Sequence, residues 1–193
     1  MEWLEDMEKT LREAELSKEE SSRWKRCCIY RVPACIKDLN PRAYRPQLVS
    51  LGPYHHGNAE LLPMEEHKRR ALQHLLLRCA GPPAVKDFVA AVEDVLEELQ
   101  SSYADLGAEW RGSEESRKRF VGMMVVDGCF LLEVMRAAGH HGNGISGDYV
   151  VSDPIFGTAN MMPYIRRDML MLENQLPVLL LQKLVAVIAG QTG

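Results

Sequence analysis

The residues with the clearest capacity for metal chemistry gather between positions 55 and 67. His55 and His56 lie in a Gly-Pro-Tyr-His-His-Gly turn, and Glu65, Glu66 and His67 stand near the start of the helix expected next. Imidazole and carboxylate groups are ligands for zinc or iron. However, adjacent histidines in a turn point in different directions, and no His-Glu-x-x-His spacing is present. The alternative is a tight turn whose imidazoles bond to the backbone, so His55, His56 and His67 are weak metal candidates and no cofactor is predicted.

Asp127 and Cys129 are the other two groups that could react, and both lie in the most apolar stretch of the chain. A buried carboxylate can serve as a general base. It can equally be a structural group that needs a cationic side chain or several backbone donors beside it, and we name Arg31 and Lys68 as the first candidates. Cys129 precedes Phe-Leu-Leu, an environment that raises a thiol pKa, so this side chain is expected to be inert and buried.

No complete catalytic site can be recognised in the sequence. It contains no Gly-x-Gly-x-x-Gly, no Gly-Lys-Ser/Thr and no Gly-x-Ser-x-Gly. The sequence therefore predicts a non-enzymatic protein. The rival hypothesis is a metal-dependent enzyme that uses the region of His55, His56, Glu65, His67 and Asp127.

The bulk properties fit a folded domain that does not bind nucleic acid. The chain has 193 residues and a net charge of −4, whereas domains held by phosphate contacts are usually strongly basic. The five cysteines are odd in number and irregularly spaced, so we expect them to be reduced. The acidic N-terminus does not resemble a signal peptide, and the longest apolar run, residues 176–189, is shorter than the roughly 20 residues that span a bilayer. The chain is thus expected to be soluble and intracellular.

Hydropathy patterning predicts a mainly helical single domain over residues 1–193, with one or two short extended strands near residues 28–51. Glu173, Asn174 and Gln175 precede Pro177 and could form a polar recognition site, but Asn174 and Gln175 are expected instead to cap the helix that follows. The predicted helices cover residues 1–26 (amphipathic and exposed), 64–79, 84–103, 114–138, 160–173 and 177–189, and a glycine- and histidine-rich loop covers residues 139–147.

Two groups of apolar side chains lead to structural expectations. The last helix is apolar on most sides, so part of it is expected to be exposed as an apolar patch that promotes self-association. The core is expected to bury Phe120, Val125, Phe130, Leu131, Leu170, Leu172 and Leu176 in one cluster.

Six stretches in one order resemble the plant family called domain of unknown function 247, over about residues 1–189. They are Ile-Tyr-Arg-Val-Pro from residue 29, Val-Ser-Leu-Gly-Pro-Tyr-His-His-Gly from 49, Met-Glu-Glu-His-Lys from 64, the run 123–133 around Asp-Gly-Cys-Phe-Leu-Leu-Glu, Asp-Pro-Ile-Phe from 153, and Asp-Met-Leu-Met-Leu-Glu-Asn-Gln-Leu-Pro from 168. The residues that carry the resemblance are Tyr30, Pro33, Gly52, Pro53, Tyr54, His55, His56, Gly57, Glu65, His67, Lys68, Asp127, Gly128, Asp168, Glu173, Asn174, Gln175 and Pro177.

The resemblance also carries expectations about function. Proteins similar to this one are usually longer and continue into a second half that ends in a transmembrane helix, so the chain resembles their N-terminal half. Arg69 and Asn160 stand where the family usually has tryptophan. The resemblance implies no established enzymatic activity, and some relatives are linked to recognition in grass self-incompatibility. It therefore implies a protein-interaction module with a protein partner.

Overall fold

The computed structural model describes residues 2–13, 27–79, 84–139, 149, 153–157 and 160–190, and the chain is mainly helical, as predicted. Within these residues the one β-type pairing is an isolated parallel bridge between Ile29 and Tyr103. The helices are α1 (Glu2–Glu13), α3 (Ala34–Lys37), α4 (Pro63–Arg78), α5 (Val85–Glu93), α6 (Leu96–Ser101), α7 (Glu114–Gly139), α8 (Met162–Met169) and α9 (Val178–Ile188), with the 3₁₀ turns η1 (Pro41–Ala43) and η2 (Ala108–Trp110).

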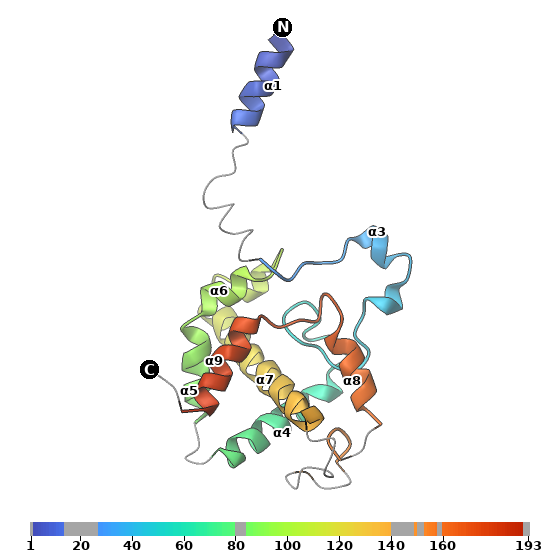
Figure 1. The fold of residues 1–193 in the computed structure, drawn as a ribbon, viewed down its shortest axis with the longest axis vertical. Helices are drawn as coiled ribbons and strands as arrows, with labels where there is room; N and C mark the ends of the chain where they lie inside the picture. Colours follow the sequence, from blue (N-terminus) through green and yellow to red (C-terminus); the bar gives the residue numbers. More distant parts are fainter. Residues whose placement is uncertain are drawn as a thin grey trace.

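The long helix α7 is the centre of the body, and α4, α5, α9 and η2 all pack against it (Figure 1). It begins where the backbone N–H of Ser116 donates to the Ser113 hydroxyl at 3.0 Å, with two glutamates in its first turn. Phe120, Met124 and Phe130 are completely buried. The all-round apolar character of the sequence there thus corresponds to a helix enclosed by its neighbours.

The helix predicted over residues 84–103 is interrupted. It forms α5 and α6 instead, because Val95 leaves the helical conformation with φ −120° and ψ 23° while its side chain is buried. Burial of a β-branched side chain outweighs helix continuity at this position.

The two segments predicted as strands are extended but form no sheet among the described residues. The first is held at one point, where the N–H groups of Cys28 and Ile29 donate to the Ser102 carbonyl and the Ala104 N–H donates back to the Ile29 carbonyl. The second, residues 47–52, has no strand beside it in the described chain.

Helix α8 ends at Met169, before the predicted end at 173, and this changes the predicted core. Five of the seven expected core residues are buried, including Phe130 and Leu176. The prediction was wrong for Leu170 and Leu172, which are 82% and 63% exposed. They lie in the turns after α8, where the buried polar neighbours described below determine which side chains face inward.

The outer helices also leave apolar side chains at the surface. Helix α9 buries Leu180, Leu184 and Val187 against the core, while Val178 and Val185 are exposed, so the predicted partial exposure of α9 is confirmed. Self-association through this surface stays a prediction.

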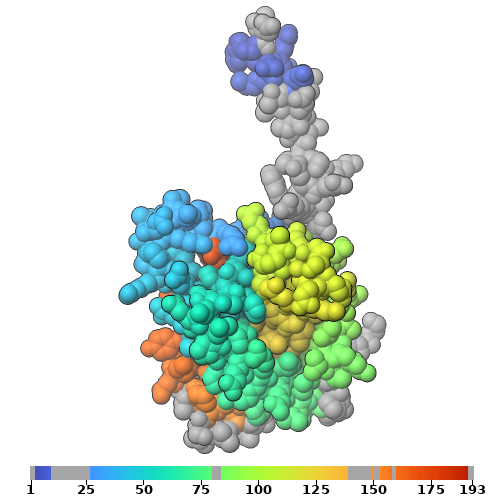
Figure 2. All heavy atoms as spheres, turned by 180° about the vertical axis from the view of Figure 1, so that it is seen from behind, coloured from blue at the N-terminus to red at the C-terminus, as the bar shows by residue number. Residues whose placement is uncertain are grey.

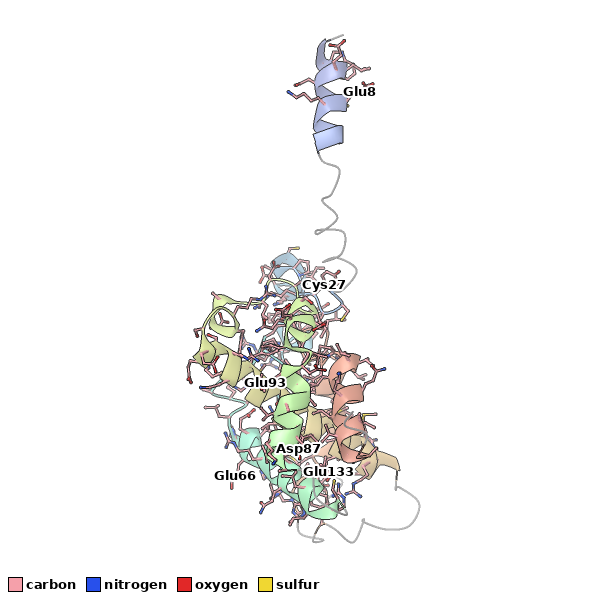
Figure 3. All side chains as sticks on the ribbon, turned by 90° about the vertical axis from the view of Figure 1, so that its left-hand side faces the viewer. Glu8, Cys27, Glu66, Asp87, Glu93 and Glu133 are labelled. Carbon is pink, nitrogen blue, oxygen red and sulfur yellow. The ribbon has the colours of Figure 1, made fainter. Side chains whose placement is uncertain are left out.

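Helix α1 stands away from the body, as Figures 1 and 3 show: Glu8 on α1 lies far from Cys27 at the edge of the body. Its Trp3, Leu4 and Met7 are exposed. Residues 14–26 of the helix expected over 1–26, and residues 140–147 of the predicted loop with His140 and His141, lie outside the described residues.

Candidate functional site

Segment 47–52, which bends at residues 47 and 48, is held by side chains and pairs with no strand in the described chain. The carboxylate of Asp168, at the end of α8, accepts hydrogen bonds from the backbone N–H groups of Gln47, Leu48 and Val49 at 2.7 to 3.1 Å. Asp168 is fully buried, and Arg167 lies 3.2 Å from it. One carboxylate therefore satisfies three consecutive backbone donors, which converge because the chain bends at Gln47 and Leu48.

Asn174 extends the same pattern by two residues. Its side-chain oxygen accepts from the Leu51 N–H at 2.7 Å, and its amide donates to the carbonyls of Val49 and Asp168, both at 3.0 Å. Pairing with the N–H of one residue and the carbonyl two residues earlier is what an adjacent strand does. Asn174 is completely buried, with a side-chain amide in place of that strand.

Asp127 completes the series from the centre of α7. One carboxylate oxygen accepts from the Gly52 N–H at 2.9 Å, and the other lies 2.7 Å from the Lys68 ammonium. The predicted cationic partner is thus confirmed as Lys68, which also contacts Glu65 at 2.5 Å and the Ser50 hydroxyl at 3.3 Å. Burial raises the pKa of Asp127, and the Lys68 ammonium opposes that shift.

Two of the three motif glycines, Gly52 and Gly128, lie where a side chain would not fit. Gly52 has φ +73°, and a Cβ there would lie 2.9 Å from both the Gln175 carbonyl and the Tyr103 hydroxyl. Gly128 faces α9, where a Cβ would be 3.3 Å from Leu180 and would collide with Leu184. Tyr103 itself donates to the Gln175 carbonyl at 3.0 Å. Both glycines therefore allow close approach of backbones and helices.

Glu173 holds a different segment, residues 32–37. Its carboxylate accepts from the Val32 N–H at 2.7 Å and pairs with Lys37 at 2.7 Å. Pro33 precedes α3 in this segment, and the Arg31 guanidinium lies 4.3 Å from the centre of the Tyr54 ring.

The expectation that Asn174 and Gln175 cap the following helix was wrong. No side chain caps α9, which begins after Pro177. The Gln175 amide donates backward to the carbonyls of Met169 and Met171 at 2.6 and 2.8 Å. These carbonyls belong to the end of α8 and the turn after it, so the polar residues close that end and not the start of α9.

The turn at residues 53–57 contains an aromatic and two histidines. The Tyr54 hydroxyl lies within hydrogen-bonding distance of the Ile29 and Ala104 carbonyls, and burial raises its pKa to about 12. His56 makes an edge-on contact with Trp110 at 5.4 Å between ring centres. Pro53 is buried, and Gly57 closes the turn with φ +81°.

His55 faces inward, and burial lowers its pKa below the ordinary value. Its Nε2 lies 3.6 Å from Glu173, too far for a hydrogen bond. His67 is half-buried on α4, with no hydrogen-bond partner for Nδ1 in the described part of the chain. The three weak metal candidates thus have separate neighbours, and the described residues hold no group of three possible metal ligands.

Cys129 is buried on α7, and burial raises the pKa of its thiol to about 12. The thiolate needed for nucleophilic chemistry is therefore strongly disfavoured at neutral pH. The environment inferred from the sequence is confirmed.

A second buried carboxylate, Glu133, was not singled out in the sequence. It lies six residues after Asp127 on α7, pairs with Arg78 and Arg136, and accepts from the Tyr149 hydroxyl at 3.1 Å. The sequence did contain a signal for it: Glu133 is a second carboxylate in the same apolar helix as Asp127. A buried carboxylate needs a cationic partner, so Glu133 could have been predicted to pair as Asp127 does.

An apolar groove with a volume of about 690 Å³ lies next to the polar residues Asp168 and Asn174, since Met169 and Gln175 line it. We define the groove by six of its lining residues: Tyr30, Val32, Ile36 and Tyr44 on one side, and Leu170 and Leu172 on the other. Figure 2 shows the blue segment that forms the first side standing out from the body, on the same side as the orange helix α8. Tyr30 and Ile36 are 56% and 40% exposed, so with the two leucines they make an accessible apolar surface.

The site and the fold define a helical domain built around an extended segment that its own buried side chains hold. No solved structure matches the chain. A family described as a plant protein of unknown function, DUF247, matches residues 29–193, and the chain belongs to this family. It is 39% identical over 168 residues to the UPF0481 protein At3g47200 of Arabidopsis thaliana, a match that covers 86% of this chain and 32% of the relative.

The chain thus spans about a third of the length of this curated relative. In the described part of the chain, none of the helices has the length and hydropathy needed to cross a membrane. The family match begins at residue 29, so α1 lies outside it.

Proposed function

We propose that this chain is a non-enzymatic recognition module that binds a protein partner through the groove. The observation that carries the proposal is how the family-motif polar groups are used. Asp127, Asp168 and Asn174 are each 1% exposed or less and bond to backbone or to Lys68. They support the fold and present no reactive group to solvent.

The groove has the composition of a protein-binding surface. An aromatic side chain and three large aliphatic ones are exposed together, with the arginine of residue 31 in the lining. Aromatic residues and arginine are enriched at protein interfaces, where they fill pockets on the partner. The backbone behind this surface is anchored by Glu173 and by Gln175, which favours a preformed site.

The test is affinity purification of the full chain from plant tissue, with quantitative comparison of a Leu170→Glu, Leu172→Glu variant. Both leucines are exposed, so the variant is expected to fold. The matched control is Leu77→Glu, because Leu77 on α4 is 76% exposed and does not line the groove. Partners that bind the purified parent and control chains directly, but are lost from the groove variant, support the proposal.

Equal binding by all three chains would contradict it. The rival, a metal-dependent enzyme, predicts a stoichiometric zinc or iron signal in the purified protein that His55→Ala removes. That result would favour a metal-dependent enzyme over a recognition module.

A further inference from the structure

Two apolar surfaces in this molecule lack a cover within the described residues: the stripe on α1 and the groove. Trp3, Leu4 and Met7 share the α1 stripe, and Trp3 is 65% exposed. Leu170 in the groove is 82% exposed. Bringing two exposed apolar surfaces together removes them from water and lowers the free energy.

The charges beside the two surfaces are opposite in sign. Helix α1 contains five acidic and two basic residues. The first side of the groove is basic, since residues 28–47 contain four cations and one acidic residue, whereas on the other side Arg166 and Arg167 are balanced by Asp168 and Glu173. Among these, Arg31 lines the groove itself. An acidic amphipathic helix therefore matches the groove in both hydropathy and charge.

From these observations we infer that α1 of the same chain docks in the groove and competes with the protein partner. The inference concerns regulation of the groove and so rests on the proposed function. A 12-residue helix is marginal by itself in water, so docking would also stabilise α1. An amphipathic helix laid in a hydrophobic groove is a common mode of peptide recognition.

The connection between the two surfaces is long enough. Residues 14–26 join α1 to the segment that lines the groove from Cys28 onward. Thirteen residues reach at most about 45 Å when extended. A tether of this length holds the helix at an effective concentration of about a millimolar, which favours the same chain over a second copy.

The family match contains the docking surface but not the helix proposed to dock on it. The family match starts at residue 29, so it includes the groove and excludes α1. Self-covering by α1 is thus a property of this chain's own N-terminal segment.

The experiment places a benzophenone amino acid at Met7 of the full chain, irradiates it, and maps the cross-linked peptides by mass spectrometry. A mixture of unlabelled and ¹⁵N-labelled chains distinguishes cross-links within one chain from those between copies. We expect cross-links to residues 28–45 and 169–175, all within one chain. The Leu170→Glu, Leu172→Glu variant should reduce their yield about tenfold, a change equivalent to about 1.4 kcal/mol. The Leu77→Glu control should leave the yield unchanged.

Cross-links between differently labelled chains would overturn the inference in favour of a second copy. Cross-links to other parts of the body, or a yield that does not depend on the two leucines, would also overturn it. Neither result bears on the proposed function, because partner binding is measured separately. Loss of partner binding in the groove variant would still support that function if α1 proved not to dock.

Discussion

The two non-helical segments that were predicted as strands, residues 28–33 and 47–52, are held in different ways. In the later segment nearly every backbone N–H donates a hydrogen bond to one of three buried side chains, Asp127, Asp168 and Asn174. The earlier one is anchored mainly through Glu173 and one bridge to Tyr103, and much of it is exposed. The difference indicates that one segment is part of the core and the other is part of a surface.

The same short motif supports both segments. Glu173 points to residues 32–37, Asn174 points to residues 49–51, and Gln175 closes the end of α8. Adjacent residues in an irregular turn face different directions, so three neighbouring polar side chains can fix three parts of the fold. Each of the three side chains therefore contributes by holding one part of the fold in place, and substituting them one at a time should affect each part separately.

The largest effect is expected for Asp168→Ala. The substitution removes the charged acceptor of the N–H groups of residues 47–49, of which the Val49 N–H is buried, and each hydrogen bond to a charged group contributes about 1.5–3 kcal/mol. The free energy of unfolding should fall by at least about 3 kcal/mol in urea denaturation. Asp94→Ala is the control, because Asp94 is exposed and its pairing with Lys183 is worth no more than about 1 kcal/mol. Equal losses in the two variants would refute the structural role of Asp168.

The next effect concerns the ion pair behind segment 47–52. Lys68→Met leaves the Asp127 charge buried without its cationic partner and should cost about 3–5 kcal/mol. Adding Asp127→Asn should recover part of this loss, since an amide oxygen can still accept from the Gly52 N–H. A double-mutant cycle measures the coupling. Additive losses would show that the two side chains act independently.

Glu173→Gln should distinguish the two segments. The variant keeps an acceptor for the Val32 N–H but loses the charge that pairs with Lys37. We expect faster amide hydrogen exchange over residues 32–37 and unchanged protection over residues 47–52, because local openings differ in free energy across a structure. Uniformly faster exchange in both segments would mean that they open as one unit.

The smallest effect is expected from His55. Burial lowers its folded-state pKa below the ordinary value of 6.5, so the unfolded chain binds more protons between the folded pKa and 6.5. Stability should therefore fall as the pH drops through that window. Denaturation of the parent and of His55→Gln at several pH values tests this: the variant should show a shallower decline. Identical slopes would exclude His55 as the source.

Sequence reasoning predicted the elements that depend on local patterning. Helices α4, α7 and α9 were placed within one residue or so of their observed ends, and Lys68 was one of the two partners named for Asp127. The prediction of burial was wrong where long-range polar contacts determine which side chains face inward. Leu170 and Leu172 are exposed, and their apolar character gave no sign of this. The side-chain support of residues 47–52 could not be predicted either, because it depends on residues more than 70 positions away.

That separation has a consequence for biosynthesis. When residues 47–52 leave the ribosome, the Asp168 and Asn174 side chains that satisfy them are about 120 residues from being made. At about 5–20 residues per second, the segment waits roughly 6–25 seconds with its peptide groups bonded only to water. An apolar stretch left in this state on a nascent chain is a binding site for chaperones. The first quarter of this chain is thus translated well before the side chains that hold residues 47–52.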